Sequence, residues 1–232
     1  MAEQTRTVVR LRLEGAVTSF RYPHFMHGVQ PTFEMPPPAT LYGHVCSALG
    51  ELVSPSAFRI AVHFTASERF FDYEHTHLFG REPKLSPFER ELIFQPRLTL
   101  YVDRPDWLDQ LRKPRYVVVL GRSQDLMRCA EVRLVDLVWL ERAYVEHALL
   151  EFEDALGLER RVSVMMPRMI DLDRRAFWGQ YAIARAPQEW NAPSWCDPLA
   201  PHWRDRLRAV RWLSFIDQPR VFDAERDSGA SS

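Results

Sequence analysis

The sequence contains no long apolar run, few cysteines and almost no lysine. No stretch of its 232 residues approaches the roughly 18 apolar residues that a membrane span requires. The first residues, MAEQTRTVVR, lack the apolar core of a secretory signal. Cys46, Cys129 and Cys196 are odd in number and far apart, without a Cys-x-x-Cys pair, which favours neither a disulfide framework nor a zinc site. We therefore expect a cytoplasmic protein with reduced thiols and no membrane partner.

A net basic charge, the usual sign of nucleic-acid binding, is also absent. The formal net charge is −1 at pH 7, whereas a domain that binds phosphates usually carries an excess of positive charge. Of the 30 basic residues, however, only Lys84 and Lys113 are lysines, so 28 are arginines. Arginine grips phosphate through a planar fork and stacks on bases, but a GC-rich genome would enrich arginine as well. The positions of the arginines must separate these two explanations.

The first 127 residues show strands and helices in the order β-α-β-β-α-β. Alternating apolar residues predict strands over 9–14, 57–64 and 97–102, and the apolar run 116–120 predicts a buried fourth strand. Pro36-Pro37-Pro38 and Gly50 bound a first helix, and Pro105 and Pro114 bound a second. This order is the split βαβ arrangement of ferredoxin-like domains, which include the RNA-recognition motif (RRM).

Two further regions complete the predicted organisation. Residues 66–96 are far longer than a hairpin turn requires, so we expect an inserted β-hairpin that protrudes as a thumb. Residues 128–217 predict a smaller β-rich region, with strands over 131–138, 142–150, 177–185 and 212–216. Residues 218–232 are small and polar and predict a disordered tail. The fold class is therefore α+β, with a ferredoxin-like domain over 1–127 and a β-rich C-terminal region.

The loop over residues 15–35 interleaves aromatic, polar and basic side chains. Such a loop can supply stacking surfaces, base-edge donors and a phosphate fork to RNA. The outward positions of the predicted sheet, by contrast, lack most of the aromatic platform of an RRM and carry Arg10, Arg12, Arg97, Thr99 and Tyr101. Phe20 could instead anchor the loop to the core. The candidate RNA-binding residues of this loop are Phe20, Arg21, Tyr22, His24, Gln30 and Thr32.

Two other basic segments are weaker candidates. Gly121 and Arg122 follow the predicted fourth strand, so backbone amides at a helix start and the arginine could hold an anion. A tight turn with a helix cap is the alternative. Arg168, Arg174, Arg175 and Trp178 form a second cluster of basic and aromatic residues, for which solvated surface charge is the alternative.

Residues 13–50 resemble the N-terminal signature of the Cas-five family of CRISPR-associated proteins, within the RAMP superfamily. The matching parts are Gly15, Ser19-Phe20-Arg21, Gln30-Pro31-Thr32, Pro36-Pro37-Pro38, Leu41-Tyr42-Gly43 and Leu49-Gly50, with looser support from Leu120-Gly121-Arg122-Ser123 and Met166-Pro167-Arg168. The resemblance implies an RRM-like domain with a thumb, acting as a subunit of the type I Cascade surveillance complex. In that role it would cap the 5′ handle of the guide RNA (crRNA), contact the backbone and large subunits, and meet target DNA only indirectly. Tyr42, within this signature, is also a candidate RNA contact.

One branch of the resembled family cleaves guide-RNA precursors without metal, using tyrosine, lysine and histidine side chains. Here Tyr42 and His44 are two apart in a predicted helix and so point in different directions, and no lysine accompanies a histidine. His75 and His77 would project to one side of the predicted hairpin, as metal ligands do, but a histidine pair on an exposed hairpin more often serves hydrogen bonding or subunit contact. We expect no catalytic residue, metal or cofactor. A metal-independent endoribonuclease and a protein-interaction module without RNA are the alternatives.

Overall fold

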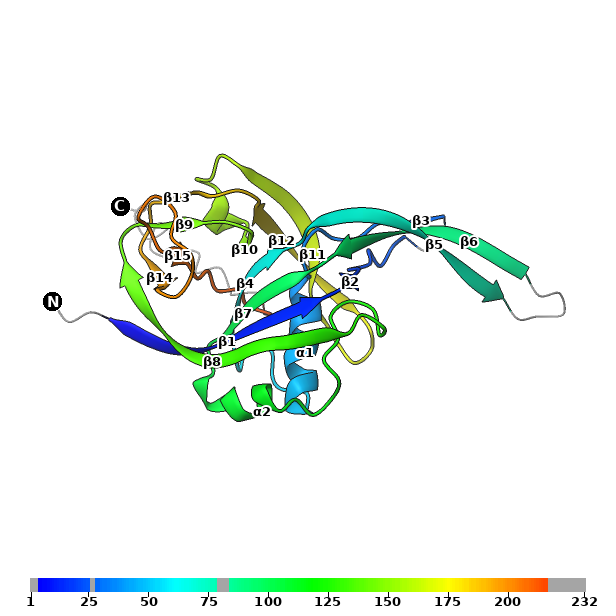
Figure 1. Cartoon of the computed structure of the whole chain (residues 1–232), viewed down its shortest axis with the longest axis horizontal. Coiled ribbons are helices and arrows are strands. Elements are labelled where there is room, and N and C mark those ends of the chain that lie inside the picture. Colours follow the sequence, from blue (N-terminus) through cyan, green and yellow to red (C-terminus); the bar gives the residue numbers. More distant parts are fainter. Residues whose placement is uncertain (1–3, 26–27, 79–83, 217–232) are drawn as a thin grey trace, which may run out of the picture.

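The structure is a computed structural model that describes residues 4–25, 28–78 and 84–216. Within these ranges the chain is a mixed α+β fold made mostly of strands, which confirms the predicted class (Figure 1). The predicted tail at 218–232 lies outside the described residues. No helix in the described ranges is long and apolar enough to cross a membrane.

The helices are α1 (Pro38–Leu49) and α2 (Leu108–Arg112), with 3₁₀ turns at Pro105–Trp107 and Glu153–Ala155. The strands are β1 (Thr5–Gly15), β2 (Val17–Thr18), β3 (Val29–Gln30), β4 (Ile60–Thr65), β5 (Glu68–Leu78), β6 (Lys84–Phe94), β7 (Arg97–Val102), β8 (Met127–Leu140), β9 (Ala143–Val145), β10 (Ala148–Glu151), β11 (Arg161–Ile170), β12 (Ala176–Ala184), β13 (Gln188–Trp190), β14 (Ser194–Asp197) and β15 (Arg208–Ala209).

Four antiparallel strands in the order β8-β1-β7-β4 form the centre of the fold. Helix α1 lies between β1 and β4 in sequence, and α2 lies between β7 and β8. The fourth strand predicted over 116–120 is wrong, because Tyr116 and Val117 are exposed and Val119 makes only an isolated bridge to Leu126. The long strand β8 takes the edge of β1 instead.

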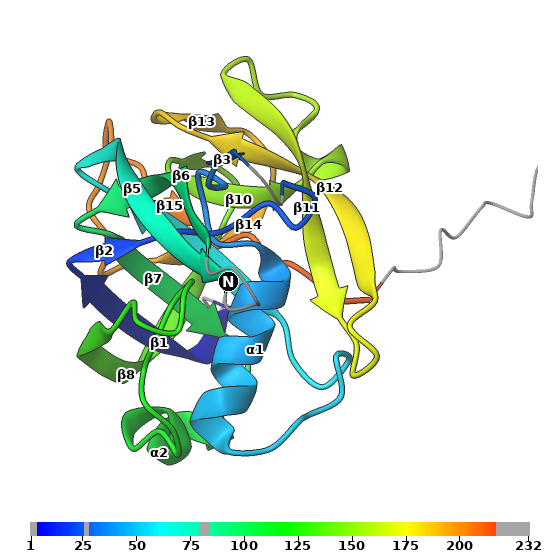
Figure 2. The same cartoon turned by 90° about the vertical axis from the view of Figure 1, so that its right-hand side faces the viewer.

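Helix α1 forms where its local signals predict it. Pro38 occupies the first turn, and Gly50 ends the helix with a left-handed φ of 82°. The backbone N–H of Gly50 donates to the carbonyl of Cys46 at 2.9 Å. Leu41 and Val45 are fully buried, and the helix packs between the central sheet and the β11–β12 hairpin (Figure 2).

The β-rich C-terminal region continues the central sheet instead of forming a separate one. In the described residues a single eleven-stranded sheet runs β11-β12-β10-β4-β7-β1-β8-β14-β15-β9-β13. The predicted strands at 131–138 and 177–185 correspond to β8 and β12, whereas 142–150 divides at His147, which has a positive φ of 45°. Residues 212–216 form no strand, and Leu213 bridges only to Ile60. The boundary predicted at residue 127 falls at the first residue of β8, and the division into domains stays a prediction.

The face of β1 and β7 that an RRM leaves open is covered here. Arg10 and Tyr101, which the alternation predicts to face outward to solvent, are buried beneath β14 and β15. The Arg10 guanidinium pairs with Asp197 at 2.8 Å and with Glu131 at 2.7 Å. The Tyr101 hydroxyl donates to the same Asp197 carboxylate at 2.7 Å. The C-terminal segment is thus joined to the N-terminal sheet by a buried ionic network.

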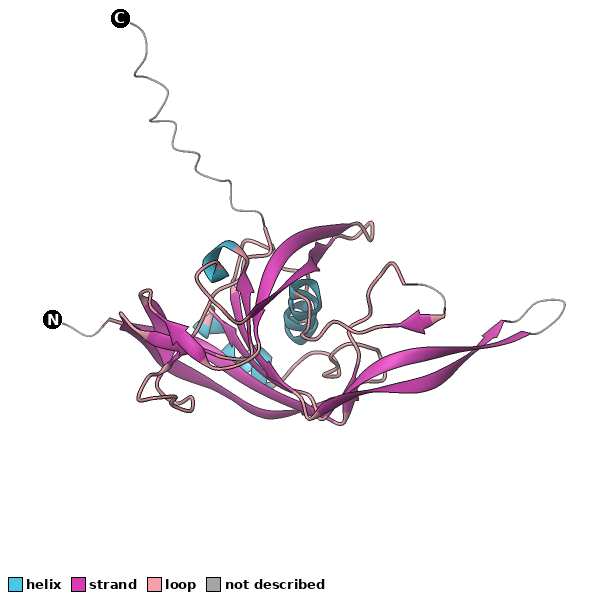
Figure 3. Ribbon diagram, turned by 90° about the horizontal axis from the view of Figure 1, so that it is seen from above, coloured by secondary structure: helices cyan, strands magenta, loops and turns pink. Residues whose placement is uncertain are grey.

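Within the range 66–96, β5 and β6 pair as the predicted hairpin, which is called the thumb below. The thumb extends well beyond the body of the molecule (Figure 3). Near the body, β2 pairs antiparallel and β3 pairs parallel with β6. The loop over 15–35 is therefore attached to the base of the thumb.

Candidate nucleic-acid interface

Part of the loop over 15–35 faces the protein core. Phe20 is only 3% exposed and meets Phe64 edge-on, with ring centroids 5.7 Å apart. The hydroxyl of Thr32 accepts a hydrogen bond from the Phe20 N–H at 2.7 Å, and Gln30 is buried on β3. All three side chains are turned toward the protein and shape the loop, and their contact with RNA stays a prediction.

The outward part of the loop carries an aromatic cluster. Tyr22 stacks on Phe33, with centroids 3.7 Å apart, and burial raises the pKa of its hydroxyl. The His24 ring lies 4.9 Å from Phe25 and 6.3 Å from Trp178 of β12. Phe25 and Trp178 are 43% and 38% exposed. We call Tyr22, His24, Phe25 and Trp178 the aromatic cluster, and it brings together two candidate segments that are far apart in sequence.

Arg21 lies at the start of this cluster and faces solvent. The backbone of Arg21 bridges to Thr32 across the loop, and this bridge holds Arg21 on the solvent side of the loop. Among the residues that the structure describes, no carboxylate pairs with Arg21. Its guanidinium is available to a phosphate beside an exposed stacking surface.

The second predicted cluster divides into two parts. Arg168 turns inward, where its Nε donates to the Tyr181 hydroxyl at 3.0 Å and its Nη2 lies 3.6 Å from Glu151. Arg174 has a left-handed φ of 60°, and Arg175 is exposed with a long ion pair in the same turn. Of the four residues of this predicted cluster, Arg174, Arg175 and Trp178 face solvent.

Gly121 and Arg122 lie in a tight turn close to the base of the thumb, with no helix after it. Gly121 has a φ of 97°, and a Cβ there would lie 2.4 Å from the Thr18 hydroxyl oxygen, so only glycine fits this approach. The Arg122 guanidinium donates to Asp125 at 2.8–3.0 Å and to Glu74 at 3.2 Å. The hydrogen bonds that Arg122 donates to the Asp125 carboxylate outweigh burial and raise the pKa of Arg122. The turn predicted to hold an anion thus holds carboxylates of the protein itself.

The residues considered for RNA cleavage are buried. The Tyr42 hydroxyl donates to the carbonyl of Val53 at 2.5 Å, and burial raises its pKa to about 12. The Tyr42 hydroxyl thus has a partner within the protein, and its contact with RNA stays a prediction. His44 is buried against Val119, and burial lowers its pKa. In the described part of the chain no three His, Cys, Asp or Glu side chains gather as a metal site would need; the side chain of His77 lies outside that part.

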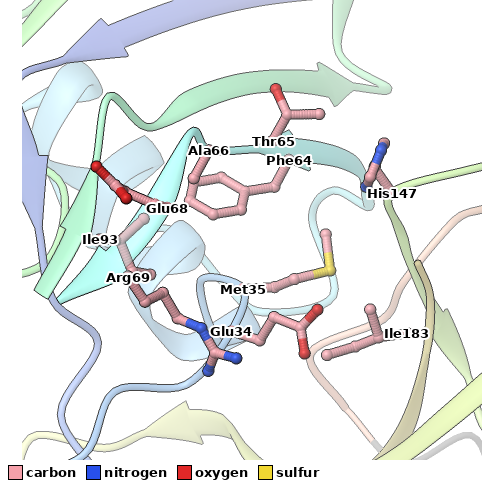
Figure 4. A pocket seen from close by; sticks show the side chains of 10 residues that line it. All are labelled: Glu34, Met35, Phe64, Thr65, Ala66, Glu68, Arg69, Ile93, His147 and Ile183. Carbon is pink, nitrogen blue, oxygen red and sulfur yellow. The ribbon is translucent and has the colours of Figure 1, made fainter. Parts of the chain in front are cut away.

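A cavity of about 200 Å³ lies at the thumb base (Figure 4). Phe64, Met35 and Ile183 line it with apolar surface, and Glu34 and Arg69 lie at its edge. Glu34 is held by Arg185 through hydrogen bonds of 2.5–2.9 Å. The cavity is an apolar recess with paired charges at its edge.

Sequence reasoning missed the contribution of the thumb. Glu74 and Arg90 of the thumb form an ion pair that also includes Arg122. The length and composition of residues 66–96 indicated a hairpin, but no local signal indicated that the hairpin meets the 121–125 turn. That contact is a product of the tertiary structure.

Comparisons with known proteins bear on the fold. No family model matches this sequence, and no curated protein matches it. Among solved structures, a chain of a "CRISPR RNA-guided surveillance complex" is similar with a TM-score of 0.55 and 16% identity, over 80% of this chain and 91% of that chain. A CRISPR protein from Archaeoglobus fulgidus is similar over 77% of this chain and 86% of its own, with 12% identity and a TM-score of 0.49. The first match shows that this chain shares its fold with a chain of such a complex.

Proposed function

We propose that this protein is a non-catalytic, RNA-binding subunit of a CRISPR surveillance complex, and that it caps the 5′ handle of the guide RNA. The observation that carries the proposal is the exposed aromatic cluster beside Arg21, at the base of the protruding thumb. Stacked bases and a phosphate fork are the chemistry of single-stranded RNA binding. The shared fold with a chain of an RNA-guided complex supports the same role.

The arrangement of the sheet favours the loop over the sheet face as the RNA site. The strand order β8-β1-β7-β4 is that expected for a ferredoxin-like RAMP core. In an RRM the open face of such a sheet stacks bases, but here Arg10 and Tyr101 are buried on that face. RNA would therefore approach the loop over 15–35 and the thumb.

Partners follow from the same proposal. The backbone and large subunits of the complex would contact this protein, and target DNA would meet it only through the assembled guide RNA. Exposed apolar side chains, including Leu172 at 85% exposure and Phe177, provide surface for such protein contacts. The protein would then act in the cytoplasm.

The proposal is tested by the affinity of the purified protein for labelled RNA that carries the repeat-derived handle. Trp178→Ala should weaken binding by roughly 5- to 150-fold, since a base stack on an aromatic side chain contributes about 1–3 kcal/mol. Arg21→Ala should weaken it by roughly 10- to 150-fold, since a hydrogen bond to a charged group contributes about 1.5–3 kcal/mol. The matched controls are Trp139→Ala and Arg142→Ala. Trp139 has the same 38% exposure as Trp178 but lies at the opposite end of β8 from the segment that follows Gly15.

Equal affinities for the cluster variants and their controls would contradict the assigned interface. Binding of unrelated RNA as tightly as handle RNA would contradict the role as a cap. Incubation of the protein with repeat RNA in EDTA tests the absence of catalysis, and discrete cleavage products would favour the endoribonuclease instead.

A further inference from the structure

Glu74 of the thumb lies between two arginines that belong to different elements. Its Oε1 accepts a hydrogen bond from Nη1 of Arg122 at 3.2 Å, and its Oε2 pairs with Nη2 of Arg90 on β6. Glu74 and Arg90 are diagonal neighbours in the hairpin, because Glu74 pairs with Phe88 and Arg90 with Asp72. One carboxylate therefore holds two guanidinium groups at the thumb base.

This group of arginines offers more donors than its carboxylate partners accept. Nε of Arg90 is buried and has no hydrogen-bond partner among the described residues. Burial lowers the pKa of Arg90, Glu74 raises it in part, and Arg122 and Arg21 lower it further, so three positive charges lie near one another. Arg21 has no carboxylate partner in the described ranges. The surplus of donors suits an anion with more acceptor oxygens than a carboxylate.

The two carboxylates that hold Arg122 differ in how readily they can leave. The Asp125 side chain is 2% exposed, and it also accepts the backbone N–H of Arg122 at 3.0 Å. The Glu74 side chain is 34% exposed and belongs to a protruding hairpin. Asp125 therefore positions Arg122, while Glu74 can be exchanged for a ligand.

We propose that Arg90 and Arg122, with Arg21 beside them, form a phosphate-binding site that Glu74 occupies until a phosphate displaces it. Arginine guanidinium groups bind phosphate and carboxylate in the same bidentate geometry, so the Glu74 carboxylate competes with phosphate for Arg90 and Arg122. This inference rests on the proposed function for the source of the phosphate, which is the backbone of the bound RNA. Displacement of Glu74 removes its ion pair with Arg122 between the thumb and the 121–125 turn, so RNA binding alters how the thumb is held.

The test compares Glu74→Gln with Glu68→Gln. Both substitutions remove one negative charge from β5, but Glu68 is exposed and has no ion pair among the described residues. Two quantities are measured for each variant: its affinity for single-stranded RNA, and the change in its thermal midpoint when inorganic phosphate is added. Glu74→Gln should bind RNA about fivefold more tightly than Glu68→Gln, the effect of losing one competing ion pair. Phosphate should also raise its thermal midpoint more.

The outcomes separate this inference from the proposed function. Equal behaviour of the two variants in both measurements would overturn the inference even if the protein binds RNA. A larger phosphate effect for Glu74→Gln, with no RNA binding by any variant, would retain the anion site and make free phosphate its ligand, while the proposed function fails.

A second variant guards against a loss of folding in Glu74→Gln. Glu74→Asp keeps the charge but shortens the reach to Arg122, so its RNA affinity should fall between those of the wild type and Glu74→Gln. Weaker binding than wild type by both Glu74 variants, at unchanged thermal midpoints without ligand, would show that Glu74 assists binding and would overturn the inference.

Discussion

The buried network around Asp197 gives the sharpest test of how the two halves of the chain are joined. Asp197 is fully buried, and its Oδ2 accepts hydrogen bonds from Arg10 at 2.8 Å and from Tyr101 at 2.7 Å. Its Oδ1 accepts the backbone N–H of Leu199 at 2.8 Å. Asp197→Ala would leave three donors without their acceptor in a site that water does not reach.

The expected loss of stability follows from the charge left behind. Removing one partner of a buried ion pair costs about 3–5 kcal/mol, because the remaining charge stays buried and uncompensated. Arg10 keeps its contact with Glu131 at 2.7 Å, so we expect the lower end, about 3 kcal/mol. For a chain of this size, that corresponds to a thermal midpoint lower by roughly 6–12 °C.

Urea and thermal denaturation measure this change, with Asp173→Ala as the control. Asp173 is exposed and lies 3.8 Å from Arg175, so its removal should change the free energy of unfolding by less than about 0.5 kcal/mol. If Asp197→Ala were as stable as the control, the network would not join the C-terminal segment to the sheet as we argue.

The pH dependence of the same variant provides a second check. Burial alone would raise the pKa of Asp197, but hydrogen bonds from Tyr101 and Arg10 outweigh it and hold the pKa below the ordinary value. Because the folded-state pKa is the lower one, this stabilisation is present above about pH 4 and is lost as the pH falls through the folded-state pKa. The stability difference between wild type and Asp197→Ala should therefore shrink in acid, and a constant difference down to pH 2 would contradict the assignment.

Three further predictions concern other positions in the fold. Gly121→Ala should lower the free energy of unfolding in urea by about 1–3 kcal/mol, because residue 121 has a positive φ and a Cβ would clash with Thr18. The control Gly43→Ala lies in helix α1 with open space around it, so it should raise that free energy by about 0.4–1 kcal/mol. Tyr42→Phe should lower the free energy of unfolding by about 1 kcal/mol, because the hydrogen bond to Val53 is lost, and should leave RNA affinity unchanged. A drop in RNA affinity would show that Tyr42 contacts RNA. Burial, with smaller effects of nearby positive groups, lowers the pKa of His63 to about 2. Because the folded-state pKa is the lower one, the protein should lose stability as the pH falls below about 6.5. His63→Gln should reduce that loss in acid titrations followed by circular dichroism.

Local patterns were sufficient wherever neighbouring residues decide the conformation. Helix α1 begins and ends at its predicted proline and glycine, and strand β7 has its predicted bounds of 97–102. The hairpin over 66–96 followed from the length of the connection and its composition. Proline and glycine act through their own φ, and strand alternation through adjacent side chains, so these features are legible in one segment at a time.

The fourth strand shows where local patterns fail. Residues 116–120 are as apolar as a buried strand, yet Val117 is 70% exposed, because β8 pairs with β1 over most of its length. Competition between two segments for one sheet edge depends on the whole fold.

The candidate interface was predictable in its composition and unpredictable in its orientation. The loop over 15–35 was identified by its mixture of aromatic and basic residues, but only the folded chain determines that Phe20 faces inward while His24 faces Trp178. Likewise, Glu74 meets Arg122 only because the thumb and a distant turn are packed together. Residue types and their spacing establish which chemistry a segment can offer, whereas burial and ion pairing depend on which distant segment covers it, and that is decided by the tertiary structure.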